Sequence, residues 1–197
     1  MCILVTYFSL ISFWSLATLC SPPCLLVTNT SDVVAVDYKT AALSSVVSGL
    51  TNAVAIDVHF SLGYIFWSDV AEANIKRFRI DVGSTTRIIT DIGVCDGLAV
   101  DWRASQLYWT DTTYSTISVS DLNGNSRGRL ISSGLDKPRA IALDLDNRYI
   151  ITDYNCSIII SFLKERNSLS SRNASLGFLL VSRGFIYRGY CLRECWA

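Results

Sequence analysis

The stretch Leu107-Tyr108-Trp109-Thr110-Asp111 decides the fold, because the chain repeats it. Ile65-Phe66-Trp67-Ser68-Asp69 precedes it, and the degraded copy Tyr149-Ile150-Ile151-Thr152-Asp153 follows it. The third positions of the copies are 67, 109 and 151, so the interval is 42 residues each time. A fixed period of about 40 to 45 residues is typical of the four-stranded blades of a β-propeller.

A second motif accompanies the first. It is a short apolar run ending in aspartate, and its copies occupy residues 52–57, 97–101 and 139–144. The terminal aspartates stand at 57, 101 and 144, so they are separated by 44 and then 43 residues. Because a near-constant interval separates this run from the Trp-Ser/Thr-Asp run that follows, both motifs belong to one repeating unit.

Between residues 25 and 154 the chain consists of short apolar runs bounded by Gly, Asn, Asp or Ser. Such runs, evenly spaced, predict an all-β fold of four-stranded antiparallel units rather than β-α-β units. The turn at Asn123-Gly124 strengthens this prediction, because Asn-Gly accepts the positive φ of a tight hairpin. We expect about three blades. Residues 25–28 and 33–37 resemble the later strands of a first blade whose earlier strands are missing.

The two ends of the chain differ from this middle. No charged residue precedes Asp32, and the apolar run over residues 1–19 is followed by small and turn-forming residues. This pattern predicts a signal peptide over residues 1–20, or alternatively an uncleaved signal anchor. The propeller segment covers 21–154. After Tyr154 the period disappears, which predicts a truncated propeller and a divergent, disordered, non-homologous tail over 155–197.

Composition excludes some function classes. Half of the residues are apolar and the formal net charge is zero, so nothing favours nucleic acid as a partner. The seven cysteines have no spacing typical of zinc sites, and we expect Cys95 to be a small buried hydrophobe. Three Asn-x-Ser sequons suit an exported glycoprotein, and they are at Asn29, Asn155 and Asn173.

Catalytic and metal sites are not indicated. The single histidine, His59, has no Ser-His-Asp arrangement or nucleophile elbow around it, and we expect it on a surface turn. The aspartates follow the repeat period and lack the calcium-loop signature. We therefore expect neither an enzyme with a small-molecule substrate nor a protein with a metal or other cofactor.

The paired motifs resemble the Tyr-Trp-Thr-Asp (YWTD) propellers of the low-density lipoprotein receptor-related family. The likeness covers about 130 of the 197 residues, and the run over 135–144 is its most specific part. Within the family, the chain is most similar to the first propeller of the Wnt co-receptor branch. The propeller begins directly after the signal, and the string at 48–57 leads to Trp67-Ser68-Asp69-Val70 as it does in that branch.

The resemblance implies that six blades close into a disc. It also implies structural roles for motif residues. Trp67 and Trp109 would pack between blades, and the aspartates would accept hydrogen bonds from the backbone of adjoining strands; these are Asp69, Asp111 and Asp153, with Asp57, Asp101 and Asp144 of the second motif. Each buried Trp removes about 150 to 250 Å² from water, on the order of 4 to 6 kcal/mol before entropy.

The resemblance further implies a ligand site. Val70, Asp96 and Arg139 fall at motif positions that contact ligand in such propellers, and a guanidinium suits a carboxylate or carbonyl of a bound loop. The alternative for Arg139 is a solvated turn residue. Acidic residues that the family places nearby are replaced, which weakens the acidic patch; the residues present are Thr51, Asn52, Ala73 and Thr113.

The implied partners are secreted proteins, namely Wnt proteins or their antagonists, with a Frizzled-type receptor beside the intact protein. The implied location is the plasma membrane with an extracellular propeller, or secretion or retention of the fragment. Two other readings stay open. One is a nidogen-like matrix or adhesion propeller, and the other is a truncated product without independent function.

Overall fold

The fold is that of a computed structural model. It describes the backbone of residues 2–6, 24–37, 39–146, 148–154, 157–162 and 179–181, and side chains within 25–37, 39–146 and 148–152. The regular elements of these residues are strands, apart from one short 3-10 helix, η1 (Phe60–Leu62). The paired strands are all antiparallel, and the all-β prediction is confirmed.

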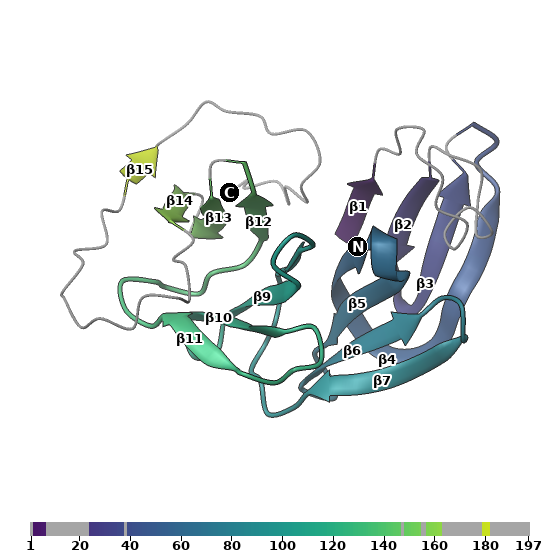
Figure 1. The fold of residues 1–197 in the computed structure, drawn as a ribbon, viewed down its shortest axis with the longest axis horizontal. Helices are drawn as coiled ribbons and strands as arrows, with labels where there is room; N and C mark the ends of the chain where they lie inside the picture. The colour runs from purple at the N-terminus through teal and green to yellow at the C-terminus, as the bar shows by residue number, and fades with distance from the viewer. Residues whose placement is uncertain are drawn as a thin grey trace, which may run out of the picture.

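Within the described ranges, fifteen strands build three sheets (Figure 1). The first sheet has the order β1 (Cys2–Thr6), β2 (Cys24–Thr28), β3 (Thr30–Asp37), β4 (Leu43–His59), β5 (Tyr64–Asp69), β6 (Asn74–Arg79) and β7 (Ser84–Ile89). The second contains β8 (Leu98–Asp101), β9 (Gln106–Asp111), β10 (Thr116–Asp121) and β11 (Gly128–Ile131). The third contains β12 (Ile141–Asp144), β13 (Tyr149–Tyr154), β14 (Ser157–Phe162) and β15 (Leu179–Val181).

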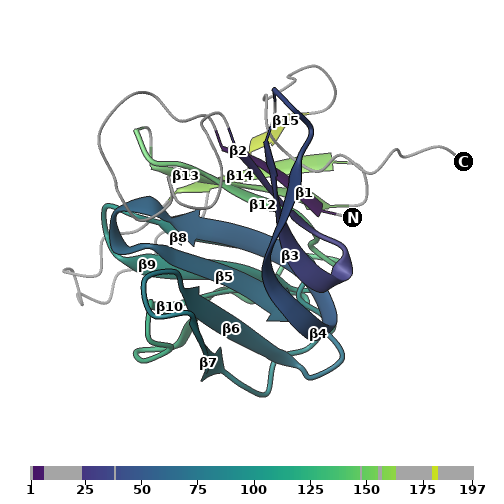
Figure 2. The same cartoon turned by 90° about the vertical axis from the view of Figure 1, so that its right-hand side faces the viewer.

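The seven-stranded sheet consists of two blades that share β4. The first part of β4, residues 43–48, pairs with β3, whereas residues 56–59 pair with β5. A register shift between Ala53 and Ile56 marks the change of partner. We call β1 to the start of β4 blade 1, the rest of β4 to β7 blade 2, β8 to β11 blade 3 and β12 to β15 blade 4. Figure 2 shows blade 2 stepping from β4 through β5 and β6 to β7.

Two parts of the chain hold strands that the sequence did not predict. β1 lies within the predicted signal peptide and pairs with β2, so it takes the place that we expected to be empty in blade 1. β14 and β15 lie within the predicted tail and complete blade 4. An apolar run has the composition of both a signal peptide and a buried strand, which explains the first difference. The domain boundaries at residues 20 and 154 stay predictions.

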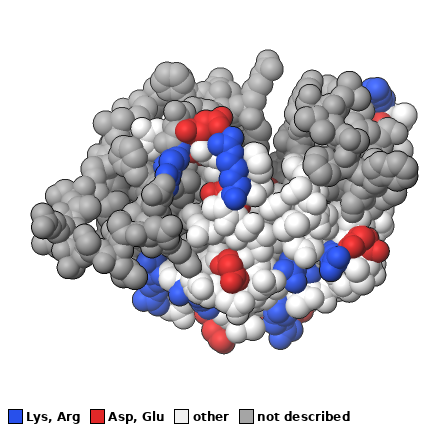
Figure 3. All heavy atoms as spheres, viewed as in Figure 1, with Lys and Arg blue, Asp and Glu red and all other residues white. Residues whose placement is uncertain are grey.

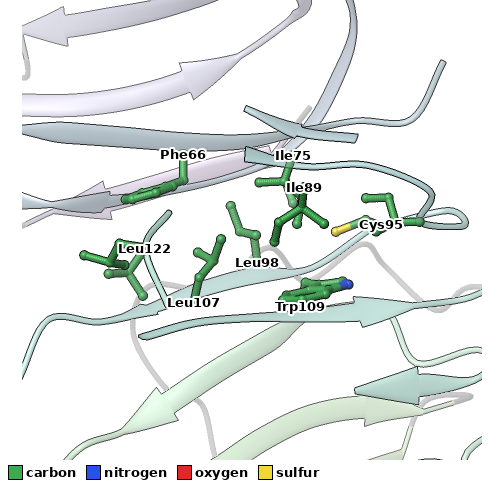
Figure 4. Packing of buried hydrophobic residues seen from close by; sticks show 11 residues of the cluster. Phe66, Ile75, Ile89, Cys95, Leu98, Leu107, Trp109 and Leu122 are labelled. Atoms are coloured by element: carbon green, nitrogen blue, oxygen red, sulfur yellow. The ribbon is translucent and has the colours of Figure 1, made fainter. Parts of the chain in front are cut away.

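Apolar side chains fill the space between neighbouring blades. Trp67 of blade 2 is fully buried against Leu26, Val33 and Ala35 of blade 1. Trp109 of blade 3 is fully buried in the next cluster (Figure 4), where the partners from blade 2 are Phe66, Ile75 and Ile89. Each motif Trp therefore packs back onto the preceding blade, while Tyr108 packs forward with Ile141 and Ile150 of blade 4.

The inner strands of successive blades are neighbours, β4 beside β8 and β8 beside β12. One carboxylate joins the first of these pairs. Asp57 accepts hydrogen bonds from its neighbour Val58 N and from Val100 N of β8, both at 2.7 Å. Loss of hydration raises the pKa of Asp57 from 3.8 to about 7, although both hydrogen bonds favour the charged form.

The tight turn after β10 holds blade 3 against blade 2. Asp121 Oδ1 accepts hydrogen bonds from Asn123 N and Asn125 N, and Gly124 N donates to Asp121 O at 3.1 Å. Gly124 has a φ of +83°, and a Cβ atom there would lie 1.9 Å from Ile88 O of β7. The turn thus needs glycine for its backbone conformation and for its close approach to blade 2.

We expect Gly124→Ala to lower the free energy of unfolding by more than the roughly 1–2 kcal/mol of a left-handed L-residue, because Ile88 must also move. Gly83→Ala is the matched control. Gly83 also has a positive φ, +68°, but a Cβ there would meet nothing within 4 Å. Denaturant unfolding of both variants measures the difference. Equal destabilisation by the two substitutions would refute the proposed contact between the turn and β7.

Asp57→Asn tests the buried carboxylate. Because the pKa of Asp57 is raised by folding, the folded state binds this proton more tightly than the unfolded state does. Its contribution to stability is therefore full below about pH 4 and is lost as the pH rises to about 7. The difference in unfolding free energy, wild type minus Asp57→Asn, should fall across that range. A constant difference would contradict the assignment.

Candidate functional site

The connections between blades lie on one face of the molecule. We call it the connection face and define it by residues 49–52, 90–97 and 132–140 together with the turns at 29, 70–73 and 112–115. Backbone hydrogen bonds hold these segments side by side. Val70 N donates to Asn52 O at 3.1 Å, and Thr112 N donates to Val94 O at 2.8 Å. The turn of each blade therefore rests on a neighbouring connection.

Hydroxyl groups at one motif position link each blade to the next. Thr28 Oγ1 donates to Val54 O at 3.2 Å, Ser68 Oγ to Cys95 O at 2.8 Å, and Thr110 Oγ1 to Arg139 O at 2.6 Å. This role of the hydroxyls is not predicted from the sequence. Their signal was present in the repeat itself, because a Ser or Thr stands at 28, 68 and 110.

The motif aspartates shape the same face. Asp69 Oδ1 accepts hydrogen bonds from Asn52 N and Glu72 N, both at 3.2 Å. Asp111 accepts from Gly93 N at 2.8 Å and from Tyr114 N at 3.0 Å. Both aspartates are almost fully buried, so each one ties its own turn to the preceding connection. The side chain of Asp153 lies outside the described residues.

The remaining motif aspartates lie at the opposite end of the inner strands. Asp101 Oδ1 accepts hydrogen bonds from Arg103 N and Ala104 N and closes the turn between β8 and β9. Asp144 is partly buried at the end of β12. Asp57 joins two blades and Asp101 closes a turn, so the second motif serves turns as well as junctions.

Glycine allows two connections to approach each other. A Cβ atom at Gly97 would lie 2.1 Å from Arg139 O and 2.9 Å from Ile141 N. Only a residue without a side chain permits this contact. The backbone beside Asp96 is thereby held against the backbone of Arg139, and Thr110 Oγ1 bonds to the latter carbonyl.

A network of paired charges surrounds Glu72 on the turn that carries Val70. Glu72 binds Lys76 Nζ and Arg87 Nη2, each at 3.0 Å, and accepts from Thr51 Oγ1 at 2.9 Å. Lys76 also pairs with Asp69 at 3.1 Å. Hydrogen bonds from Lys76 first, then from Asn74 and Thr51, lower the pKa of Glu72 from 4.5 to about 2. The acidic groups of this turn are thus neutralised within the protein.

The three predicted ligand residues all lie on the connection face. Val70 and Asp96 are partly buried and Arg139 is exposed. The Asp96 carboxylate and the Arg139 guanidinium form no hydrogen bond or ion pair with other described residues. Two large apolar side chains are exposed nearby, Val94 at 42% and Tyr114 at 59%. Figure 3 shows charges of both signs spread among uncharged surface, consistent with the net charge of zero.

Thr51, Asn52, Ala73 and Thr113 make structural contacts on this face. Thr51 donates to Glu72, and Thr113 Oγ1 accepts from Val94 N at 2.9 Å. Asn52 contributes its backbone to Asp69 and Val70, and Ala73 O accepts from Ile92 N at 3.3 Å. These positions hold the loops together and add no negative charge to the face.

His59 corrects one expectation, because it is 3% exposed and is not a surface turn residue. It ends β4 just before η1, its Nδ1 lies 3.3 Å from Ser61 Oγ, and burial lowers its pKa.

Burial of Cys95 is confirmed. Among the described residues, no group of three or more His, Cys, Asp or Glu side chains is placed to hold a metal ion. The described part also has no helix long and apolar enough to cross a membrane.

The sequons are placed unequally. Asn29 is exposed in the turn between β2 and β3, at the edge of the connection face. Asn155 and Asn173 lie outside the described residues.

Ser68→Ala tests the link between blades. Besides donating to Cys95 O, Ser68 Oγ accepts from Ala55 N at 3.0 Å, and both bonds are buried. Loss of the hydroxyl leaves two buried polar groups unpaired, at about 1–3 kcal/mol each. We expect a loss of about 2–4 kcal/mol in denaturant unfolding. Ser68→Thr, which keeps the hydroxyl, should lose less than half as much, and equal losses would refute the role of the bond.

Comparison with known proteins supports the repeat assignment. The model of the low-density lipoprotein receptor repeat class B matches residues 105–145. Low-density lipoprotein receptor-related protein 5 of Mus musculus is 42% identical over 143 residues, which are 70% of this chain and 9% of that protein. The Homo sapiens protein of the same name is 42% identical over 133 residues, 65% of this chain and 8% of its own length. The chain thus spans less than a tenth of these relatives.

Solved structures share the fold. A nidogen/laminin complex matches with a TM-score of 0.64 at 23% identity, over 70% of this chain and 56% of that chain. An auxiliary nutrient binding protein from Bacteroides thetaiotaomicron matches with a TM-score of 0.60 at 15% identity, over 71% and 35%. The repeats, their blades and the similarity to receptor-related proteins agree, and the chain belongs to the low-density lipoprotein receptor-related family of YWTD-repeat propellers.

Proposed function

We propose that the connection face binds secreted protein ligands of Wnt signalling, either Wnt proteins or their antagonists, through Val70, Asp96 and Arg139. The domain is then a non-enzymatic, extracellular recognition module, attached to the plasma membrane in the intact protein, with a Frizzled-type receptor as neighbour. The similarity to low-density lipoprotein receptor-related protein 5 supports the receptor context, and the arrangement of charges supports the choice of face.

The observation that carries the proposal is the contrast between paired and unpaired charges. The four charged groups around the turn at 70–73 bind one another; they are Asp69, Glu72, Lys76 and Arg87. Asp96 and Arg139 have no such partners among the described residues, yet the close contact at Gly97 holds their backbones together. Unpaired charges on a rigid support suit recognition, because little ordering is needed on binding.

The surroundings of these charges favour a partner loop with both polar and apolar groups. Val94 and Tyr114 offer exposed apolar surface, and Tyr and Arg are frequent at the energetic centres of interfaces. The paired Glu72 network adds little net charge. We therefore expect binding to depend less on salt than binding to an acidic patch would.

Arg139→Ala tests the proposal. Binding of a purified Wnt protein or secreted Wnt antagonist to the secreted chain should weaken about tenfold or more, equivalent to about 1.4 kcal/mol. Arg129→Ala removes an exposed guanidinium from β11, away from the connection face, and is the matched control. Titration by surface plasmon resonance measures both variants. Absence of binding by the unmodified chain, or equal effects of the two substitutions, would exclude this site.

A further inference from the structure

We propose that Asn29 carries an N-linked oligosaccharide that covers the blade 1 edge of the connection face and limits which partners reach Val70. This inference rests on the export that the proposed function requires. It concerns the one sequon whose side chain the structure describes, Asn29-Thr30-Ser31.

The turn leaves the acceptor atom available. Asn29 Oδ1 accepts hydrogen bonds from Asp32 N at 2.8 Å and from Ser31 Oγ at 3.3 Å, and Asn29 N donates to Asp32 O at 3.1 Å. These bonds use the side-chain oxygen and the backbone, and they form an Asx-type turn. Asn29 Nδ2 makes no hydrogen bond to a described residue, and Asn29 is exposed.

The chemistry is compatible with this turn. Nδ2 of Asn29 attacks C1 of the first sugar of a lipid-linked oligosaccharide diphosphate. The N–C1 bond forms, the bond from C1 to the phosphate oxygen breaks, and one amide proton is released with the lipid diphosphate leaving group. The product keeps the amide carbonyl, so Oδ1 continues to accept from Asp32 N. The finished turn therefore tolerates the modification without losing its own bonds.

The position of the Asn29 turn determines which part of the connection face the oligosaccharide covers. Thr30 pairs with Ala53 of β4, and Ala53 also pairs with Asp69, the residue before Val70. Two strand spacings of about 4.8 Å therefore separate the Asn29 turn from the Val70 turn. A bulky, hydrated oligosaccharide at Asn29 extends across this interval. It leaves the Asp96 and Arg139 side of the face open, because that side belongs to the junctions of blades 2, 3 and 4.

Peptide mapping of the chain secreted from cultured animal cells tests the modification. Enzymatic deglycosylation in heavy-oxygen water should convert Asn29 to labelled aspartate. Ser31→Ala removes the sequon but keeps the Asn29–Asp32 bond, so the label should disappear, whereas Ser31→Thr preserves the sequon and should keep the label. Unlabelled Asn29 beside labelled Asn155 or Asn173 would overturn the inference alone. No label at any of the three would overturn it together with the extracellular placement.

Cysteine labelling tests the steric effect. In Val70→Cys protein, a polyethylene-glycol maleimide should react several times faster in the Ser31→Ala background than in the Ser31→Thr background, while a small maleimide should react equally in both. Val82→Cys places the thiol on the β6–β7 turn, where Val82 is 61% exposed, and should show no difference. If the polyethylene-glycol maleimide reacts with Val70→Cys at equal rates in the two backgrounds, the oligosaccharide does not cover this part of the face.

Discussion

The structure depends on a hydrogen bond from a motif hydroxyl of one blade to the backbone that enters the next blade. Sheets packed only by apolar side chains can slide, because dispersion and hydrophobic forces have little directionality. A buried hydroxyl donor at a defined carbonyl removes that freedom, since leaving either group unpaired costs free energy. Ser68 and Thr110 supply this bond at successive junctions, and Trp109 of blade 3 is fully buried at the junction that Ser68 joins.

Fixing the blades also fixes the loops between them. The motif aspartates hold the turns against the connections, and Gly97 brings the Asp96 connection onto the Arg139 connection. The charged side chains that hold these loops in place pair with one another, as those around Glu72 do. The charges left over, on Asp96 and Arg139, are those available to a partner. Scaffold and recognition thus use different residues of the same repeat, and the scaffold limits where recognition residues can stand.

The sequence predicted the strands of blades 2 and 3 well, because their apolar runs repeat at the blade period. The family resemblance implied ligand contacts at Val70, Asp96 and Arg139, and this role stays a prediction. The sequence did not predict the hydroxyl links, since a Ser or Thr in a motif has no preferred partner until the next blade is in place. His59 was misplaced for a related reason: burial beside a neighbouring blade depends on tertiary packing, whereas its local sequence is typical of a turn.

Amide hydrogen exchange with and without a bound Wnt-pathway protein tests the central claim, that the connection face is the recognition surface and the opposite turns are not. Binding should slow exchange at residues 70–73, 93–97 and 136–140, and it should leave the turns at 80–83 and 102–105 unchanged. Protection confined to those opposite turns, or spread evenly over both faces, would contradict this account.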